Sequence, residues 1–478
     1  ESGVDRAEAV GSPRQALTLD EYGMVAGHRE SRLAVSLNAI DAAYPPRAYA
    51  WFVVVLLTIA YAISLLDRWI ISLLLEPIKA HFGVSDTQMG LLMGPVFAAL
   101  YVGLGLPLGW LADRYDRRRL IAAAMACWCL MTVCCGLARS FGQLTLARLG
   151  VGVGEAGLAP AANSLIADYF PRAEQSRAIS FFNMGVATGL GIAYLIGGYI
   201  ISWMQARPVM DLPLVGELAT WQLVFVVAGL PGLIIAAVIA FVREPVRRDR
   251  LVSADAKVTM GDAVRYVWIR RRAFLPLMVG MGTSPLIGYA WNWLPAMFTR
   301  TWGWSVTDLA GVYGWILVVF GPLGALSGGW IATALYKRGR KDAPYIATII
   351  ALVSMVVLST LLPLMPSAAL AAVLLVPATW AGAMSTAAGV ASAVFLATGE
   401  VRAQVAAIYM VIISSIGLLL GPSLVGLLND LWFTDPAGIR YSLSLTALVA
   451  GGLLTAYLIS GRRHYAQAVA ELEAAHGV

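Results

Sequence analysis

Long runs of apolar residues alternate with short polar connections through most of this chain. About twelve of the runs reach roughly 20 residues, the length that an α-helix needs to cross a hydrocarbon core about 30 Å thick. The runs cover residues 49–75, 87–112, 119–138, 142–168, 175–203, 221–242, 273–298, 307–335, 343–364, 368–397, 403–432 and 439–460. The pattern predicts an all-α integral membrane protein with twelve transmembrane helices.

The longest break between runs divides the predicted spans into two groups of six. The predicted parts are a polar tail (1–48), a first bundle (49–242), a central loop (243–272), a second bundle (273–460) and a second tail (461–478). The sequence GWLA at 109–112, followed by a basic loop, is echoed by GWIA at 329–332, again followed by a basic loop. Glycines and basic loops recur in many membrane proteins, so the echo alone is weak. Together with the break it predicts two pseudo-symmetric six-helix bundles, the architecture of transporters whose site lies between the halves.

Composition and charge agree with a membrane location. Hydrophobic residues make up 59% of the chain and charged residues 13%, against about 25% charged in soluble domains. The net charge of +6 is spread over short clusters between the runs, which argues against nucleic-acid binding. Lysine and arginine gather in alternate connections, so those connections and both termini are predicted to face the cytoplasm across the cell (inner) membrane.

Four charged residues fall inside the predicted spans: Asp67, Arg68, Arg148 and Glu155. A charge at the centre of a membrane helix costs roughly 2.5 to 3.5 kcal/mol even on lenient scales, so such residues usually have a partner or a function. A rise of 1.5 Å per residue places Asp67 and Arg68 roughly 11 Å deep, Arg148 about 8 Å and Glu155 about 18 Å. We expect Asp67 to pair with Arg148 in one state, Arg68 and Arg148 to compete for Glu155, and all four to face a central cavity.

The two acids are the predicted proton-coupling residues. Arginine keeps its proton in proteins, so titration must fall on Asp67 or Glu155, with Arg68 and Arg148 as their charge partners. The alternative interpretation is a buried ion-pair cluster that only orients helices.

A second charged motif, GWLADRYDRRRL (109–120), lies between the second and third predicted spans. Its acid and arginines can form charge-assisted hydrogen bonds that exist in one conformation and break in another, which predicts a cytoplasmic gate. The alternative is an ordinary positively charged loop. In the second half Thr333 stands where Asp113 would be. The predicted gate residues are Gly109, Asp113, Arg114, Arg117 and Arg118.

The motif and its position resemble the signature loop of the major facilitator superfamily, and within it the chain resembles bacterial Spinster-type (Spns) transporters. The residues that carry this resemblance are LLDRW (65–69), GWLADRY (109–115), RLGVGVGEAG (148–157), SLIADYF (164–170) and SRAISFFNMGVATGLG (176–191). They cover the N-terminal half well and the C-terminal half only in outline. The resemblance implies a proton-coupled secondary transporter that works by alternating access, with lysophospholipids or sphingoid lipids as the associated cargo.

Polar residues at cavity depth are few, and the second half holds tryptophans but no buried charge that can be placed. A cavity charged on one side and apolar on the other suits a small amphipathic substrate. Tryptophans also form interfacial belts, which is the alternative for these side chains. The predicted cavity residues are Asn163, Asn183, Thr188, Tyr289, Asn292, Trp291, Trp380 and Ser414.

Other functions find less support in the sequence. The four cysteines share one apolar run without further ligands at metal spacing, and no GxxxxGK[ST] loop is present, so we expect a non-enzyme without metal or cofactor, driven by the proton gradient. A carrier of small organic anions or drugs is the alternative within transport. A membrane sensor or receptor would need a signalling module, for which the tail and the central loop are too short. The expected partners are the substrate, protons and membrane lipids, and the expected state is a monomer.

Overall fold

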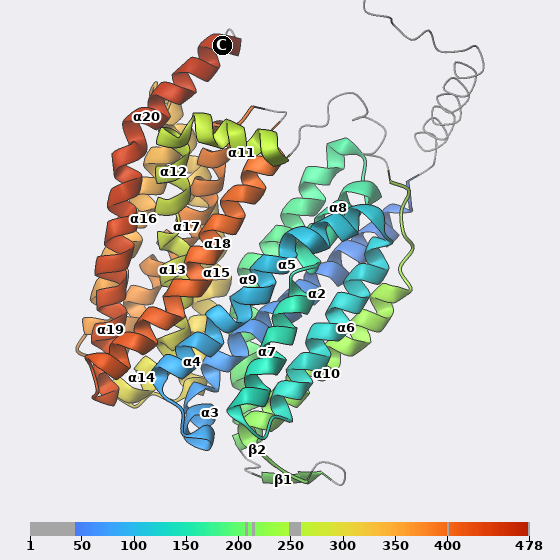
Figure 1. Cartoon of the computed structure of the whole chain (residues 1–478), viewed down its shortest axis with the longest axis vertical. Helices are drawn as coiled ribbons and strands as arrows, with labels where there is room; N and C mark the ends of the chain where they lie inside the picture. Colours follow the sequence, from blue (N-terminus) through green and yellow to red (C-terminus); the bar gives the residue numbers. More distant parts are fainter. Residues whose placement is uncertain (1–43, 206–208, 213–215, 248–259, 399–400, 477–478) are drawn as a thin grey trace, which may run out of the picture.

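A computed structural model describes residues 44–205, 209–212, 216–247, 260–398 and 401–476 (Figure 1). Most of the predicted first tail and the middle of the predicted central loop lie outside these residues. The described part is almost entirely helical, as the sequence predicts. Figure 1 shows two helical bundles side by side, one built from the N-terminal half of the chain and one from the C-terminal half.

The N-terminal half consists of α2 (Arg47–Leu73), α3 (Leu75–Phe82), α4 (Asp86–Met93), α5 (Pro95–Arg114), α6 (Arg117–Gly136), α7 (Phe141–Glu155), α8 (Leu158–Tyr169), α9 (Arg172–Gln205), the strands β1 (Val209–Leu212) and β2 (Gly216–Ala219), and α10 (Thr220–Ala240). The C-terminal half consists of α11 (Met260–Ile269), α12 (Arg271–Gly280), α13 (Thr283–Ala290), η2 (Trp291–Trp293), α14 (Leu294–Trp302), α15 (Val306–Lys337), α16 (Ala343–Leu361), η3 (Leu362–Leu364), α17 (Ala368–Phe395), α18 (Arg402–Leu431), η4 (Pro436–Gly438), α19 (Ile439–Leu445), η5 (Thr446–Gly451) and α20 (Gly452–His476).

Eleven helical segments of the described residues are long and apolar enough to cross a membrane. They match eleven of the predicted spans, and the remaining span, the fourth, forms as two shorter helices, α7 and α8. The break lies at Ala156 and Gly157. Pro160 follows four residues after Ala156 and has no amide hydrogen to donate to the Ala156 carbonyl, and the loss of this hydrogen bond favours a kink or a break here.

Three further elements were not predicted. Helix α11 lies within the predicted central loop, and β1 pairs with β2 as an antiparallel hairpin between the fifth and sixth spans. The last helix, α20, continues to His476, well into the predicted second tail. Its extension is rich in alanine and glutamate, which favour helix without needing an apolar face.

The two ends of the molecule differ in chemistry. We call the end that carries Arg114, Lys337 and α11 the basic end, and the end that carries β1 and β2 the hairpin end. In Figure 1 the bundles converge toward the hairpin end and separate toward the basic end. The lysine and arginine distribution predicts that the basic end is cytoplasmic.

Glycines bring the halves into close contact on two sides. Helix α4 packs on α18, and α9 packs on α15. A Cβ atom added at Gly90 would lie 2.6 Å from the Pro422 carbonyl oxygen, and one at Gly191 would lie 2.5 Å from the Gly314 carbonyl oxygen. Small residues let membrane helices approach this closely, so the halves are tightly packed along these lines.

Candidate functional site

A buried ion pair joins α2 to α7 inside the N-terminal half. Arg68 donates through Nε to Glu155 Oε2 at 3.0 Å and forms a second contact with the same oxygen through Nη2. Ser64, one turn before Arg68 on the same face of α2, donates to this oxygen at 3.0 Å. The Glu155 side chain is fully buried, and the Arg68 side chain is 11% exposed. The sequence therefore identified the pair correctly, and the i, i+4 spacing would have added Ser64.

Arg68 also reaches the other half of the molecule. Its Nη1 lies 3.5 Å from the hydroxyl of Tyr289 on α13, a predicted cavity residue. The ring of Trp69, the next residue on α2, stacks on the Tyr289 ring at 5.8 Å between centroids. The charged pair thus lies at a contact between the two halves.

Two aromatic rings of α5 complete the surroundings of Arg68. Its guanidinium carbon lies 4.9 Å from the centroid of Phe97 and 4.7 Å from that of Tyr101. Such cation–π contacts stabilise a charge that has lost its water. Phe97 and Tyr101 were not predicted, because in the sequence they look like any aromatic residues of an apolar span.

Arg148 does not bind a carboxylate in this conformation. It donates to the main-chain oxygens of Asp67, at 3.0 Å, and Arg68, at 3.3 Å. The expected side-chain pair of Arg148 with Asp67 is absent here, and Glu155 is held by Arg68. Successive residues of a helix point about 100° apart, so Asp67 and Arg68 cannot both face α7.

The Asp67 carboxyl group points instead toward Trp128 and Thr132 on α6. Asp67, Arg148 and Glu155 are 0%, 1% and 3% exposed, so the expectation that all four charged residues face an open cavity is wrong for this conformation. Neither carboxyl oxygen has a hydrogen-bond partner, and the Trp128 indole nitrogen and the Thr132 hydroxyl have none either. Burying an ionised carboxylate here would be very costly, and burying a protonated carboxyl group costs much less.

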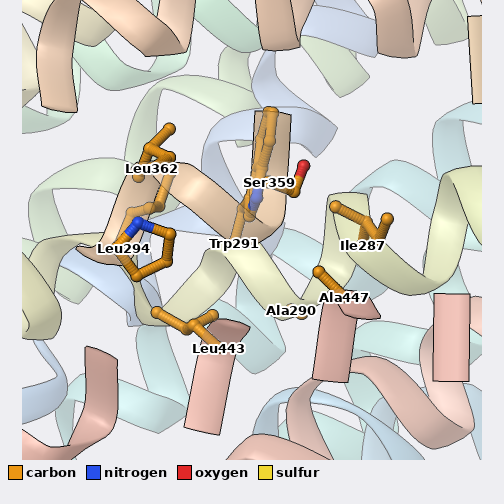
Figure 2. Close-up of a pocket in the computed structure, with 9 residues that line it drawn as sticks. Ile287, Ala290, Trp291, Leu294, Ser359, Leu362, Leu443 and Ala447 are labelled. Carbon is orange, nitrogen blue, oxygen red and sulfur yellow. The ribbon is translucent and has the colours of Figure 1, made fainter. Parts of the chain in front are cut away.

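The other predicted cavity residues are scattered. Trp291 lines a narrow pocket inside the C-terminal half with Ile287, Leu294 and Ser359 (Figure 2). The cavity volume of this pocket is only about 10 Å³, which is too small for a substrate.

The remaining members of the predicted cavity set differ in exposure. Asn292 is buried in η2, next to the part of the C-terminal half that touches α2. Asn183 is exposed on α9, and the half-buried members of the set are Asn163, Thr188, Trp380 and Ser414. Their place in a binding site stays a prediction.

The signature loop forms its contacts within the N-terminal half. Arg117 is 1% exposed and donates to Asp168 at 2.5 Å and to Glu244 at 2.7 Å. Arg118 donates to Asp116 and to the Val242 carbonyl.

The other predicted gate residues lie on α5. Arg114 stacks 3.8 Å from the Trp110 ring centroid, and Gly109 is half-buried. The side chain of Asp113 lies outside the described part of the chain, so its expected gate contact stays a prediction.

A second charged cluster, which the sequence did not predict, ties the halves together at the hairpin end. Arg300 of α14 donates to Asp86 of α4 at 2.6 and 2.9 Å and to Glu76 of α3 at 2.6 Å. Lys79 and Asn429 also donate to Asp86. We call these five residues the hairpin-end cluster. Asp430 of α18 accepts from the main-chain amides at the start of α4, at 3.2 and 2.7 Å, and so continues the cluster.

Known proteins resemble the chain over most of its length. The family model described as Major Facilitator Superfamily matches residues 57–422. An MFS-type efflux pump of Mycolicibacterium smegmatis is 27% identical over 436 residues, which cover 90% of this chain and 96% of the pump. Protein spinster of Drosophila melanogaster is 25% identical over 313 residues, which cover 64% of this chain and 49% of that protein.

A solved structure agrees with the arrangement of the helices. The crystal structure of a bacterial homologue of the human lysosomal transporter Spinster, inward-facing and unoccupied, superposes with a TM-score of 0.73. It is 25% identical, and the match covers 89% of this chain and 98% of that chain. The predicted resemblance to Spinster-type transporters is confirmed.

Proposed function

Because this chain belongs to the Major Facilitator Superfamily, we propose that it is a proton-coupled secondary transporter of an amphipathic, lipid-like molecule. The observation that carries the proposal is the Arg68–Glu155 pair, which is buried in one half and reaches Tyr289 of the other half. A proton arriving at Glu155 would cancel one charge of the pair and leave Arg68 without its strongest partner. Protonation would therefore change a contact between the halves, which is what coupling requires.

Asp67 supplies a second acid with a different role. Its carboxyl group is enclosed and forms no ion pair, which disfavours the ionised form, so we propose that Asp67 carries a proton in this conformation. Arg148, bound to main-chain oxygens beside it, is the cation available to Asp67 once a movement of α2 or α7 changes the register of their contact. Release of the proton would accompany that movement.

The conformation supports alternating access. The halves are tied at the hairpin end by glycine contacts and by Arg300, and the superposed bacterial structure is inward-facing. With the basic end in the cytoplasm, the chain would have closed its outer side and left the inner side able to open.

The cargo is proposed from the relatives and from the chemistry of the site. The bacterial structure is described as a homologue of a human lysosomal transporter, and the resemblance to Spinster-type proteins implies lysophospholipids or sphingoid lipids. The buried charges lie in the N-terminal half, and Tyr289 and Trp69 add aromatic surface beside them. A polar headgroup near Arg68 with an apolar chain toward the C-terminal half fits this division.

A carrier of drugs or small organic anions is the second candidate. The observation that favours it is the similarity to an MFS-type efflux pump over nearly the whole chain. Counterflow in proteoliposomes with lysophospholipids, sphingoid bases and cationic dyes, each with and without a pH gradient, separates the two. Uptake of the lipids alone supports the first candidate, and uptake of the dyes alone supports the second.

Proton coupling is tested by Glu155→Gln and Asp67→Asn in the same assay. Each change removes a titratable group and keeps its size, so we expect gradient-driven uptake to fall at least tenfold while exchange without a gradient persists. Asp435→Asn is the matched control, because this acid is exposed, lies outside the spans and the signature loop, and accepts from the Ala437 amide. Full gradient-driven uptake by both variants would overturn the proposal.

A further inference from the structure

A positively charged groove lies between the start of α12 and the extension of α20, at the basic end. Two adjoining pockets of about 330 Å³ each form it. Its charged lining consists of Arg270, Arg271, Arg272, His464 and Glu471, so arginines outnumber acids by three to one. We infer that this groove binds the phosphate headgroup of an anionic phospholipid in the leaflet at the basic end.

Helix packing creates the groove. Gly461 brings α20 against α12, since a Cβ atom there would overlap Pro276. Toward the basic end, α12 reaches only as far as its first residue, Arg271. Helix α20 runs in the opposite direction and extends past this level to His476. The space between the two is open on the side of the basic end, and Figure 1 shows α20 extending past α12 there.

Ring contacts orient two of the arginines, and within the described residues no acid forms an ion pair with them. Arg270 lies 4.2 Å from the ring centroid of Tyr266, and Arg271 lies 5.4 Å from that of Trp268. Arg271 also donates to the Trp268 carbonyl at 3.3 Å. Among the ion pairs of the described residues, none involves Arg270, Arg271 or Arg272. Their remaining N–H groups are available to a phosphate, which arginine binds in bidentate fashion.

The groove lies at the level of lipid headgroups. On α20 the exposed side chains change from Leu453 and Tyr457 to His464 and Gln467 as the helix passes Ser460. Ser460 and Tyr457 line the groove, so its polar part opens directly onto an apolar surface of the same helix. A lipid with its phosphate among the arginines would lay its acyl chains along Tyr457 and Leu453.

The position of helix α11 also places the groove at the level of the lipid headgroups. It lies across the basic end of the C-terminal bundle (Figure 1), with Ala263 and Val267 buried against the bundle. The face beside this buried pair exposes Met260, Val264 and Trp268. An amphipathic helix with an exposed apolar face beside arginines is typical of the membrane interface. Ordinary positive loops do not combine such a helix with a groove, and basic pockets between helices on the cytoplasmic side bind anionic headgroups.

The inference is independent of the cargo and of proton coupling. The test measures binding of dioleoylphosphatidylglycerol to the purified full chain in neutral detergent by native mass spectrometry. We compare the wild type with Arg271→Gln/Arg272→Gln, whose changes fall on exposed side chains, and with the matched control Lys337→Gln/Arg338→Gln. The control removes two equally exposed charges at the same end but away from the groove. Thermal unfolding without lipid verifies that both variants are folded.

We expect the groove variant, which lacks two interfacial arginines, to bind the anionic lipid roughly thirtyfold more weakly and the control to differ less than twofold. Dioleoylphosphatidylcholine should bind the wild type as weakly as phosphatidylglycerol binds the groove variant. Equal binding by wild type and groove variant, or equal losses in both variants, would overturn the inference. Displacement of the lipid by millimolar inorganic phosphate at constant ionic strength would show a free-anion site instead.

Discussion

Charged clusters occupy both ends of the N-terminal half, and they differ in which parts of the molecule they join. At the basic end, Arg117 binds Asp168 and Glu244, all three from the N-terminal half. At the hairpin end, Arg300 and Asn429 of the C-terminal half bind Asp86 of the N-terminal half. In each cluster one arginine–aspartate pair is buried, and each contains short charge-assisted hydrogen bonds.

The difference lies in what a movement of the halves would do to each cluster. If the halves move as units, the contacts of Arg117 persist through the movement, whereas those of Arg300 must break. A contact changes a conformational equilibrium only when it differs between the two states. The Arg117 cluster should therefore act on stability, and the hairpin-end cluster on the balance between conformations.

The largest effect is expected for Arg117→Gln. The change removes the buried Arg117 cation from its ion pairs with Asp168 and Glu244, and breaking a buried pair in this way costs about 3 to 5 kcal/mol. We expect a markedly lower thermal unfolding midpoint in detergent, measured by intrinsic fluorescence. Arg119→Gln is the control, because Arg119 is 75% exposed and lies 3.5 Å from Asp116. Equal unfolding midpoints for the two variants would contradict the interpretation.

A smaller effect, of a different kind, is expected for Arg300→Gln. Asp86 keeps Lys79 and Asn429 as donors, so we expect a loss at the low end of the range for buried pairs, about 2 kcal/mol. Because that loss applies only to the conformation closed at the hairpin end, the population open at that end should rise roughly thirtyfold. The unfolding midpoint should change less than in Arg117→Gln.

Distances between spin labels at Ala80 and Thr434 measure this shift, since both positions are exposed at the hairpin end. The labels require replacement of the four native cysteines. Arg440→Gln is the matched control, because Arg440 lies at the same end but donates to Leu364 within its own half. A distance distribution that is the same for both variants would show that the hairpin-end cluster does not hold the halves together.

The sequence predicted the fold well because membrane spans are local in sequence. A run of about 20 apolar residues between polar connections is sufficient to define a span, so eleven of the predicted spans match single helical segments. The fourth span was also located, but its break was not. Pro160 and the neighbouring glycines are compatible with either a kink or a break, and only the packing of α7 and α8 decides between them.

The sequence also predicted part of the candidate site. Asp67, Arg68, Arg148 and Glu155 stand out because any charge in a span is unusual. Which charge binds which depends on the rotation of each helix about its axis, and the sequence does not define that rotation. Arg300 and Asp86 lie 214 residues apart at the ends of spans, where charges are common, so nothing in the sequence linked them.

The smallest effect is expected in a third cluster, at the basic end of the C-terminal half. Asp342 precedes α16 as Asp116 precedes α6, and it accepts hydrogen bonds from Arg340 at 3.3 Å and from Arg462 at 2.8 Å. Burial raises the pKa of Asp342, but the hydrogen bonds from Arg462 and Arg340 outweigh burial and hold the pKa below its ordinary value. This cluster, like that of Arg117, lies within one half.

The lowered pKa predicts how the contribution of Asp342 changes with pH. The folded state binds the proton more weakly than the unfolded state, so the stabilisation is complete above the unfolded pKa of about 3.9 and is lost as pH falls through the folded value. Because both arginines are more than 40% exposed, we expect Asp342→Asn to cost no more than about 1 kcal/mol at pH 7. The difference between the unfolding midpoints of the two proteins should be smaller at pH 3 than at pH 7. The spin-label distances at the hairpin end should be unchanged, and a shift in them would show that a contact within one half also sets the balance between conformations.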